Sequence, residues 1–308
     1  MRLVRYICAQ PADLYYAWQV EVMINNFVAN GIDIKDIDIV CAKVSDKIST
    51  EWIALKNGYE ANFYFYDDTR EDKSYIPSLQ AHILEKHWIA NCELECTPIF
   101  FHDADFLFVR PFDFKPFLED ANWYFSDTIS YIGSTYILSK GQEVFDTMCN
   151  AIGIEKQLVL DNQRNSGGAQ KLFKNINQHY WRKVFEHQMK LYKAMQTVAH
   201  IKKEHDTYGI QIWTASMWAE LWTGLMMGKQ IRVPKEFDFC FAVDKISVFD
   251  RLSFYHNAGV SSSNDGYFFK GDYINQLPYN NCVEPSKEFT SHFYWEWIDK
   301  TAKVTKLL

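Results

Sequence analysis

Short apolar runs alternate with amphipathic segments along the first 110 residues of the chain. Four runs are predicted as strands covered on both faces, because they are almost continuously apolar: Leu3–Cys8, Ile37–Lys43, Asn62–Tyr66 and Pro98–His102. Helical patterns occupy residues 14–30, 46–57 and 76–88 between them, and the first two end at Gly31 and Gly58, where glycine is the favoured helix terminator. The alternation predicts βαβ units and a mostly parallel sheet.

The pattern is mixed beyond about residue 120. Trp123–Phe125 and Ser134–Leu138 have strand-like sequences, whereas Gln142–Ile152 and residues 211–227 have helical ones, and a lysine-containing helix closes the chain. The second helical segment carries Trp213, Trp218 and Trp222, most of which we expect in the core.

Two aspartates stand between apolar runs directly after the fourth predicted strand. Asp103 and Asp105 are two residues apart, so in an extended chain both side chains point to one side, where their repulsion calls for a cation. Mg²⁺ and Mn²⁺ prefer such oxygen ligands, and open α/β sheets bind ligands at the carboxyl ends of their strands. We therefore predict a metal and nucleotide site here, with His102 on the opposite face as a structural residue.

The composition is that of a packed globule, with 48% hydrophobic residues and few prolines. No stretch approaches the ~20 apolar residues of a membrane helix, and the first residues lack the layout of a signal peptide. The seven cysteines are odd in number and scattered, which favours reduced thiols, and Cys92 and Cys96 have no second pair at zinc-site spacing. We expect a soluble cytoplasmic protein.

One segment departs from the acidic character of the chain. Residues 171–204 hold eight lysines and arginines against two glutamates, whereas the whole chain has a net charge of −7. Tyr180, Trp181 and Tyr192 interleave with these cations. Phosphates pair with cations and bases stack on aromatic rings, so the segment is a candidate nucleic-acid surface. The alternative is a solvated pair of amphipathic helices.

With the Asp-x-Asp motif after the fourth strand, the sequence resembles the GT-A glycosyltransferases, and the resemblance covers most of the chain. It implies a GT-A (Rossmann-like) α/β fold in which Asp103, Ala104 and Asp105 bind Mn²⁺ or Mg²⁺ and the diphosphate of a nucleotide-sugar, most simply a UDP-sugar. Residues after the first and third strands would hold the base and ribose: Ala9, Gln10, Pro11, Tyr66, Asp67 and Asp68.

The resemblance also implies roles in the second half of the chain. Many members complete the metal shell with a histidine near the C-terminus, here His256, and place a glycine-containing loop against the donor sugar, here Gly167, Gly168 and Gln170. An ordinary helix-entry turn explains the same glycines. Residues 1–110 would form the nucleotide-sugar half, and residues 111–308 the helical and irregular acceptor half.

The sequence leaves two catalytic mechanisms open. The metal would neutralise charge on the departing nucleotide. An inverting enzyme needs a carboxylate base near the acceptor hydroxyl, for which Asp206, Glu220 and Asp127 are candidates, whereas a retaining enzyme relies on electrostatic support.

Several acceptors and functions stay open. The overall pattern is similar to phage glycosyltransferases that modify hydroxymethylated pyrimidines in DNA, arabinosyltransferases among them, which would place the protein in the host cytoplasm and imply base flipping. A glycan or lipopolysaccharide is the alternative acceptor. Rival functions are a metal-dependent nuclease or phosphotransferase, and a binding protein for nucleotide-sugar or DNA without turnover.

Overall fold

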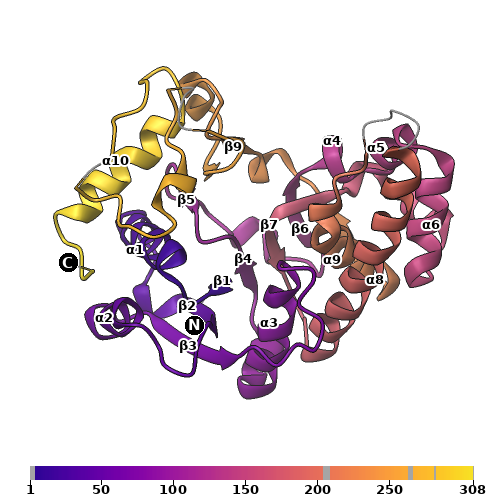
Figure 1. Ribbon diagram of the computed structural model, residues 1–308, viewed down its shortest axis with the longest axis horizontal. Helices are drawn as coiled ribbons and strands as arrows, with labels where there is room; N and C mark the ends of the chain where they lie inside the picture. The colour runs from indigo at the N-terminus through magenta and orange to yellow at the C-terminus, as the bar shows by residue number, and fades with distance from the viewer. Residues whose placement is uncertain (1–3, 204–208, 263–265, 281, 308) are drawn as a thin grey trace. The chain divides into compact units, whose positions relative to one another are not determined.

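The chain divides into two compact units (Figure 1). The computed structural model describes residues 4–203, 209–262, 266–280 and 282–307. The first unit comprises Met1–Asp68, Phe100–Pro116 and Glu236–Leu308, and the second comprises Thr69–Ile99 and Phe117–Lys235. Each unit is therefore assembled from separate stretches of chain. The functional halves at 1–110 and 111–308 stay a prediction.

The first unit contains the predicted parallel strands. They stand in the order β3-β2-β1-β4, and β1 pairs in parallel with β2, as β2 does with β3. Their bounds are β1 (Arg5–Pro11), β2 (Ile37–Lys43), β3 (Asn62–Asp67) and β4 (Ile99–Phe101). The helices between them are α1 (Leu14–Ala29) and α2 (Thr50–Gly58). The predicted α/β architecture is confirmed.

Local chemistry sets both ends of α1. The Asp13 carboxylate accepts a hydrogen bond from the Tyr16 backbone N–H at 3.1 Å and so caps the amino end. At the other end Gly31 has φ +84°, a conformation that glycine adopts without strain. The carboxyl end of β1 and the start of α1 are thereby held close together.

A second, small sheet in the same unit consists of β5 (Phe106–Phe108), β9 (Phe239–Phe241) and β10 (Phe254–His256). β10 pairs antiparallel with β5 and parallel with β9. The rings of Phe100, Phe106, Phe108 and Phe254 contact one another with centroids 5.0–5.8 Å apart. This apolar packing explains why the chain after Asp105 is as hydrophobic as the chain before Asp103. Among the described residues of the unit, α10 (Ser291–Ala302) is the other regular α-helix.

The second unit contains the other strands and most of the helices. β6 (Trp123–Asp127) pairs antiparallel with β7 (Gly167–Phe173) and parallel with β8 (Ile231–Arg232). Its helices are α3 (Ser78–Ala90), α4 (Ile129–Ile132), α5 (Ser134–Ser139), α6 (Gln142–Ile152), α7 (Lys156–Asp161), α8 (Gln178–Lys203) and α9 (Ala215–Met226). None of the helices in the described parts of the chain is long and apolar enough to cross a membrane.

The structure corrects three local predictions in this unit. Ser134–Leu138 is helical instead of a strand, because packing of α5 against α4 and α6 outweighs the strand propensity of Tyr136 and Ile137. The segment around Gly167 and Gly168 begins strand β7 and is not a helix-entry turn. Most of the basic segment forms the single helix α8 instead of a helix pair. As expected, Trp218 and Trp222 are buried in the core.

A buried glutamate joins four segments of the first unit. Glu21 of α1 is fully buried, and its carboxylate accepts hydrogen bonds from the hydroxyls of Tyr59 (3.1 Å), Tyr279 (2.6 Å) and Thr305 (2.7 Å) and from the Lys306 backbone N–H (2.6 Å). A buried charge is tolerated where donors surround it in this way. The C-terminal segment is thereby attached to α1.

We expect Glu21→Gln to lower the free energy of unfolding by about 2–3 kcal/mol, since the amide cannot accept all four hydrogen bonds and leaves buried donors unpaired. Urea unfolding at pH 7 measures the change. Glu288→Gln, which removes only the surface pair with Lys245, is the control and should leave the midpoint unchanged. Equal midpoints for both variants would contradict the role of Glu21.

Candidate functional site

Asp103 and Asp105 lie in a turn at the carboxyl end of β4. The Phe106 backbone N–H donates to the Asp103 carbonyl at 3.2 Å, which closes the turn between β4 and β5. The predicted extended conformation of this triplet is therefore wrong, and a tight turn brings the two carboxylates together instead. The turn forms because the apolar strands on either side belong to different sheets.

His256 reaches the aspartates through the small sheet. It stands opposite Phe106 in the β5–β10 register, and the next backbone N–H, that of Asn257, donates to the Asp105 carbonyl at 3.1 Å. The His256 Nε2 lies 3.2 Å from Asp105 Oδ1 and 3.5 Å from Asp103 Oδ2. One ligand atom from each of the three side chains lies within 4.8 Å of the others. The structure therefore brings together the three residues predicted as metal ligands.

Lys270 is a fourth member of this group that the sequence did not indicate. Its ammonium contacts the Asp105 carboxylate. Asp105 is only 3% exposed. Burial would raise the pKa of Asp105, but Lys270 and His256 outweigh it and hold that pKa well below its usual range. Asp105 is therefore ionised at neutral pH.

The partners of Asp105 are shifted in the complementary direction. Burial disfavours the charged forms of His256 and Lys270, yet the nearby carboxylates, Asp105 above all, raise the pKa of both side chains. The site is thus a compact set of alternating charges around the buried Asp105 carboxylate, where interactions between charges are stronger than in water.

Two tyrosines of the first turn of α1 adjoin the same group. Tyr15 and Tyr16 are half-buried, and their rings meet edge to face at 5.0 Å. Burial is the main cause of the raised pKa of each phenol, and the charges of Asp105 and Asp103 act in the same direction on Tyr16. Both phenols are therefore close enough to the acids for their charges to act on them.

His102 is structural, as predicted. Its ring is fully buried, Nδ1 lies 2.9 Å from the Asp103 carbonyl, and Phe27 and Phe100 contact it. Burial lowers the pKa of His102 to about 4, so the ring is neutral at pH 7.

The residues expected to bind the base and ribose share one edge of the first unit. Pro11 pairs with Ala42, and Lys43 with Asp67, so the carboxyl ends of β1 to β3 stand in register. Ala9 and Gln10 are buried, whereas Pro11, Tyr66 and Asp68 are half-buried and Asp67 is exposed. The Gln10 amide donates to the Val40 carbonyl at 3.3 Å. Contact with a nucleotide stays a prediction for these residues.

Packing within the second unit explains the glycine at 167, and a side chain at 168 would require Met217 to move. A Cβ on Gly167 would lie 2.5 Å from the Phe125 Cβ, and one on Gly168 would lie 2.4 Å from the Met217 Cε. The neighbouring Gln170 is fully buried and accepts from the Ser126 hydroxyl at 2.9 Å. These three residues therefore support strand and helix contacts in the described structure, and their contact with a sugar stays a prediction.

The three candidate bases differ in accessibility. Glu220 is 5% exposed and its carboxylate lies 2.6 Å from the Lys171 ammonium, which is also buried. Asp127 is exposed at the carboxyl end of β6, where its Oδ1 accepts from the Ile129 backbone N–H at 2.9 Å. Asp206 lies outside the described residues. Among the described candidates, only Asp127 is open to solvent.

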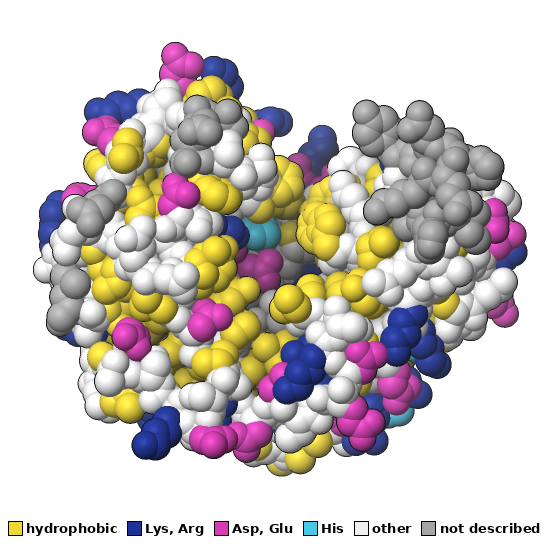
Figure 2. Space-filling view, viewed as in Figure 1, with side chains coloured by type: hydrophobic (Ala, Val, Ile, Leu, Met, Phe, Trp, Pro, Cys, Tyr) yellow, Lys and Arg dark blue, Asp and Glu magenta, His cyan; other side chains and the backbone are white. Residues whose placement is uncertain are grey.

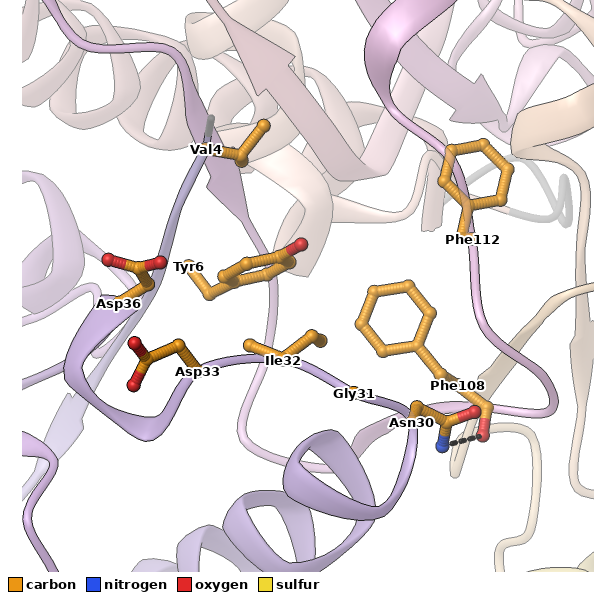
Figure 3. Close-up of a pocket in the computed structure, with 9 residues that line it drawn as sticks. All are labelled: Val4, Tyr6, Asn30, Gly31, Ile32, Asp33, Asp36, Phe108 and Phe112. Carbon is orange, nitrogen blue, oxygen red and sulfur yellow. Dashed lines mark hydrogen bonds between the residues drawn. The ribbon is translucent and has the colours of Figure 1, made fainter. Parts of the chain in front are cut away.

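A separate cavity of about 260 Å³ lies elsewhere in the first unit. Figure 3 shows the rings of Tyr6, Phe108 and Phe112 around it, with the carboxylates of Asp33 and Asp36 at its edge. Because Tyr6 lies near the amino end of β1, the cavity is at the opposite edge of the sheet from Pro11. We therefore do not assign it to the metal group.

Comparison with known proteins gives the fold. No family model and no curated protein matches the sequence. Among solved structures, the chain is similar to the bifunctional glycosyltransferase WbbM, with a TM-score of 0.51 and 12% identity over 96% of this chain and 50% of WbbM. The galactosyltransferase LgtC, in complex with donor and acceptor sugar analogues, has a TM-score of 0.46 and 14% identity over 96% of this chain and 95% of LgtC.

The likeness to WbbM shows that this chain has the mixed α/β fold of a GT-A glycosyltransferase, as predicted. At 12% identity the likeness shows the fold alone, and the chain spans half the length of WbbM. What the chain does must therefore be argued from its own side chains.

The contact between Lys270 and Asp105 has a measurable consequence for metal binding. We expect Lys270→Met to tighten Mn²⁺ binding in the absence of nucleotide by about tenfold, because a cation beside a metal ligand opposes a second cation. Isothermal titration calorimetry measures the affinity. Lys245→Met, which removes an exposed ion pair of the same unit, serves as the control. Weaker Mn²⁺ binding in Lys270→Met would show that the ammonium does not oppose the metal.

Proposed function

We propose that this chain is a metal-dependent glycosyltransferase that transfers a sugar from a nucleotide-sugar, with a UDP-sugar as the first donor to test. The observation that carries the proposal is the convergence of Asp103, Asp105 and His256 at the carboxyl end of β4 in a chain with a GT-A fold. Ligands of open α/β sheets bind at this edge.

The donor set fits a divalent cation. Two carboxylates and one imidazole within 4.8 Å of one another suit Mn²⁺, and also Mg²⁺ with water or phosphate oxygens completing the shell. A bound cation supplies charge neutralisation for the diphosphate leaving group. The chain's own contribution is to orient these ligands through the β5–β10 pairing and to hold the Lys270 ammonium beside them.

The aromatic residues next to the acids fit the remainder of a nucleotide. Tyr15 and Tyr16 project from the first turn of α1, which follows directly on β1. An aromatic face attracts a planar base by stacking. We assign the base to these rings and to the predicted residues at the ends of β1 and β3.

Asp127 is the candidate that best fits an acceptor base. A general base must reach the proton that it removes, and Asp127 is exposed at a strand's carboxyl end. Glu220 is unsuited, because its ion pair with Lys171 is buried in the second unit.

A glycan acceptor is better supported than DNA. Tyr180 and Trp181 of α8 are 1% exposed, so they are not available for stacking on bases. Arg182, Lys183 and Lys193 each lie 2.7 Å from a carboxylate. On the face shown in Figure 2, basic and acidic side chains are interspersed instead of forming a basic band. We therefore propose a glycan or lipopolysaccharide as acceptor.

A nuclease or phosphotransferase is not favoured by the acids. Among the residues that the structure describes, Asp103, Asp105 and His256 are the one group with metal-ligand geometry. Two-metal chemistry would need further carboxylates at that position.

The donor site can be tested by thermal unfolding with UDP-, GDP- and CMP-sugars, with and without Mn²⁺. We expect one donor to raise the Tm only with the metal, and the double variant Asp103→Asn with Asp105→Asn to abolish that rise. Asp299→Asn, which removes an exposed carboxylate of α10, is the matched control and should respond like the unaltered protein. An unchanged metal-dependent rise in the double variant would falsify the proposed function.

The role of Asp127 can be separated from donor binding. We expect Asp127→Asn to slow sugar transfer by about 100-fold or more while the metal-dependent Tm rise with the donor persists. The asparagine oxygen can still accept from the Ile129 N–H, so local structure is kept. Product formation is measured by chromatography with the acceptor found by screening. A variant with full transfer activity would remove Asp127 from the mechanism.

A further inference from the structure

We propose that Trp213 forms an acceptor platform in the second unit, on which the apolar face of a pyranose ring stacks. The inference rests on the proposed function and adds to it a residue that would hold the acceptor sugar. Trp213 is 63% exposed, whereas Trp218 and Trp222 of the adjoining helix are at most 1% exposed. Leaving one large aromatic face in water costs free energy unless something covers it.

The turn that carries Trp213 is held from both sides by tyrosine hydroxyls. The Tyr75 hydroxyl donates to the Trp213 carbonyl at 2.7 Å and accepts from the Ser216 N–H at 2.9 Å. The Gln211 N–H donates to the Tyr136 hydroxyl at 3.1 Å. Because the backbone of the turn is already fixed in this way, it loses little conformational entropy when a ligand binds to the indole.

Further packing makes the support rigid. The Tyr75 ring stacks on Tyr192 of α8 with centroids 4.6 Å apart, and Ile76, the next residue along the chain, is 72% exposed. Tyr75 thus links the Trp213 turn to α8 and to a second exposed apolar side chain.

Trp213 and Asp127 lie at the same end of the second unit. Trp213 lies in the turn Ile212–Thr214 directly before α9, whose Met217 packs on Gly168 at the start of β7. The Trp218 indole donates to the Ile132 carbonyl at 2.7 Å, and Ile132 ends the short helix that follows Asp127. The first turn of α9 and the carboxyl end of β6 are therefore neighbours, which is where an acceptor hydroxyl must come under the proposed function.

Size and charge favour a sugar over other occupants. The axial C–H bonds of a pyranose form an apolar face that matches one indole, and the negative face of the ring attracts them. A stable protein interface needs about 800 Å² on each partner, far more than one tryptophan and one isoleucine supply. Nucleic acid requires cations for its phosphates, and Lys193, beside Tyr192, is paired with Asp72 at 2.7 Å.

Saturation-transfer NMR on the full chain in Mg²⁺ buffer tests the platform. The probes are the methyl pyranosides of glucose, galactose, mannose and N-acetylglucosamine, together with a DNA duplex containing 5-hydroxymethylcytosine. We expect saturation of aromatic protons to reach the C–H protons of one face of at least one pyranoside. The signal should disappear in Trp213→Ala, persist in Trp213→Phe and be unchanged in Ile89→Ala, which truncates an exposed residue of α3.

Kinetics give the second measurement. Trp213→Ala should raise the acceptor KM by about tenfold, the effect of losing one aromatic contact, and leave metal-dependent hydrolysis of the donor unchanged. Equal pyranoside signals in Trp213→Ala and the unaltered protein, no pyranoside signal at all, or a Trp213-dependent signal from the DNA duplex alone would each overturn the platform. Failure of the proposed function is recognised separately, since no donor would then give a metal-dependent Tm rise.

Discussion

The burial of the Asp105 carboxylate is the constraint on which the first unit depends. A carboxylate that is almost fully buried beside Phe106 and Leu107 must be compensated by positive charge. His256 and Lys270 supply it, and both come from a part of the chain some 150 residues away in sequence. The small sheet serves this requirement, because the pairing of β10 with β5 brings His256 to Asp105. Charge compensation and strand pairing therefore stabilise the same long-range contact.

The same unit shows a second use of a buried acid, and the difference between the two is informative. Glu21 is surrounded by hydroxyl and backbone donors, which satisfy its oxygens from fixed segments of the chain. A carboxylate that is satisfied by neutral donors in this way does not need a metal ion. Asp105 instead has cationic partners and shares His256 with the half-buried Asp103. Two carboxylates that share one imidazole are a good ligand set for a divalent ion, whereas a carboxylate in a closed hydrogen-bond network is not.

The sequence was sufficient to predict the α/β fold and the group of Asp103, Asp105 and His256, because strand periodicity is local and the family resemblance supplied the histidine. It was insufficient for Lys270, which follows an irregular segment with no periodic signal to place it. The sequence also did not show that Gly167 and Gly168 begin strand β7, since a glycine that packs closely against Phe125 has the same sequence signature as one that approaches a ligand. Contacts between distant segments decide between such alternatives.

Residue type alone also fails to identify a catalytic carboxylate. Glu220 and Asp127 have the same chemistry in water, but Glu220 lies against Lys171 in the interior, and removing either partner would break a buried ion pair. A catalytic role for Glu220 would therefore require breaking an interaction that stabilises the second unit. Asp127 has no such conflict, because one of its oxygens accepts a hydrogen bond from the Ile129 N–H while the side chain remains exposed to solvent. A carboxylate at a strand end can thus combine a modest structural role with chemistry, which the interior pair cannot.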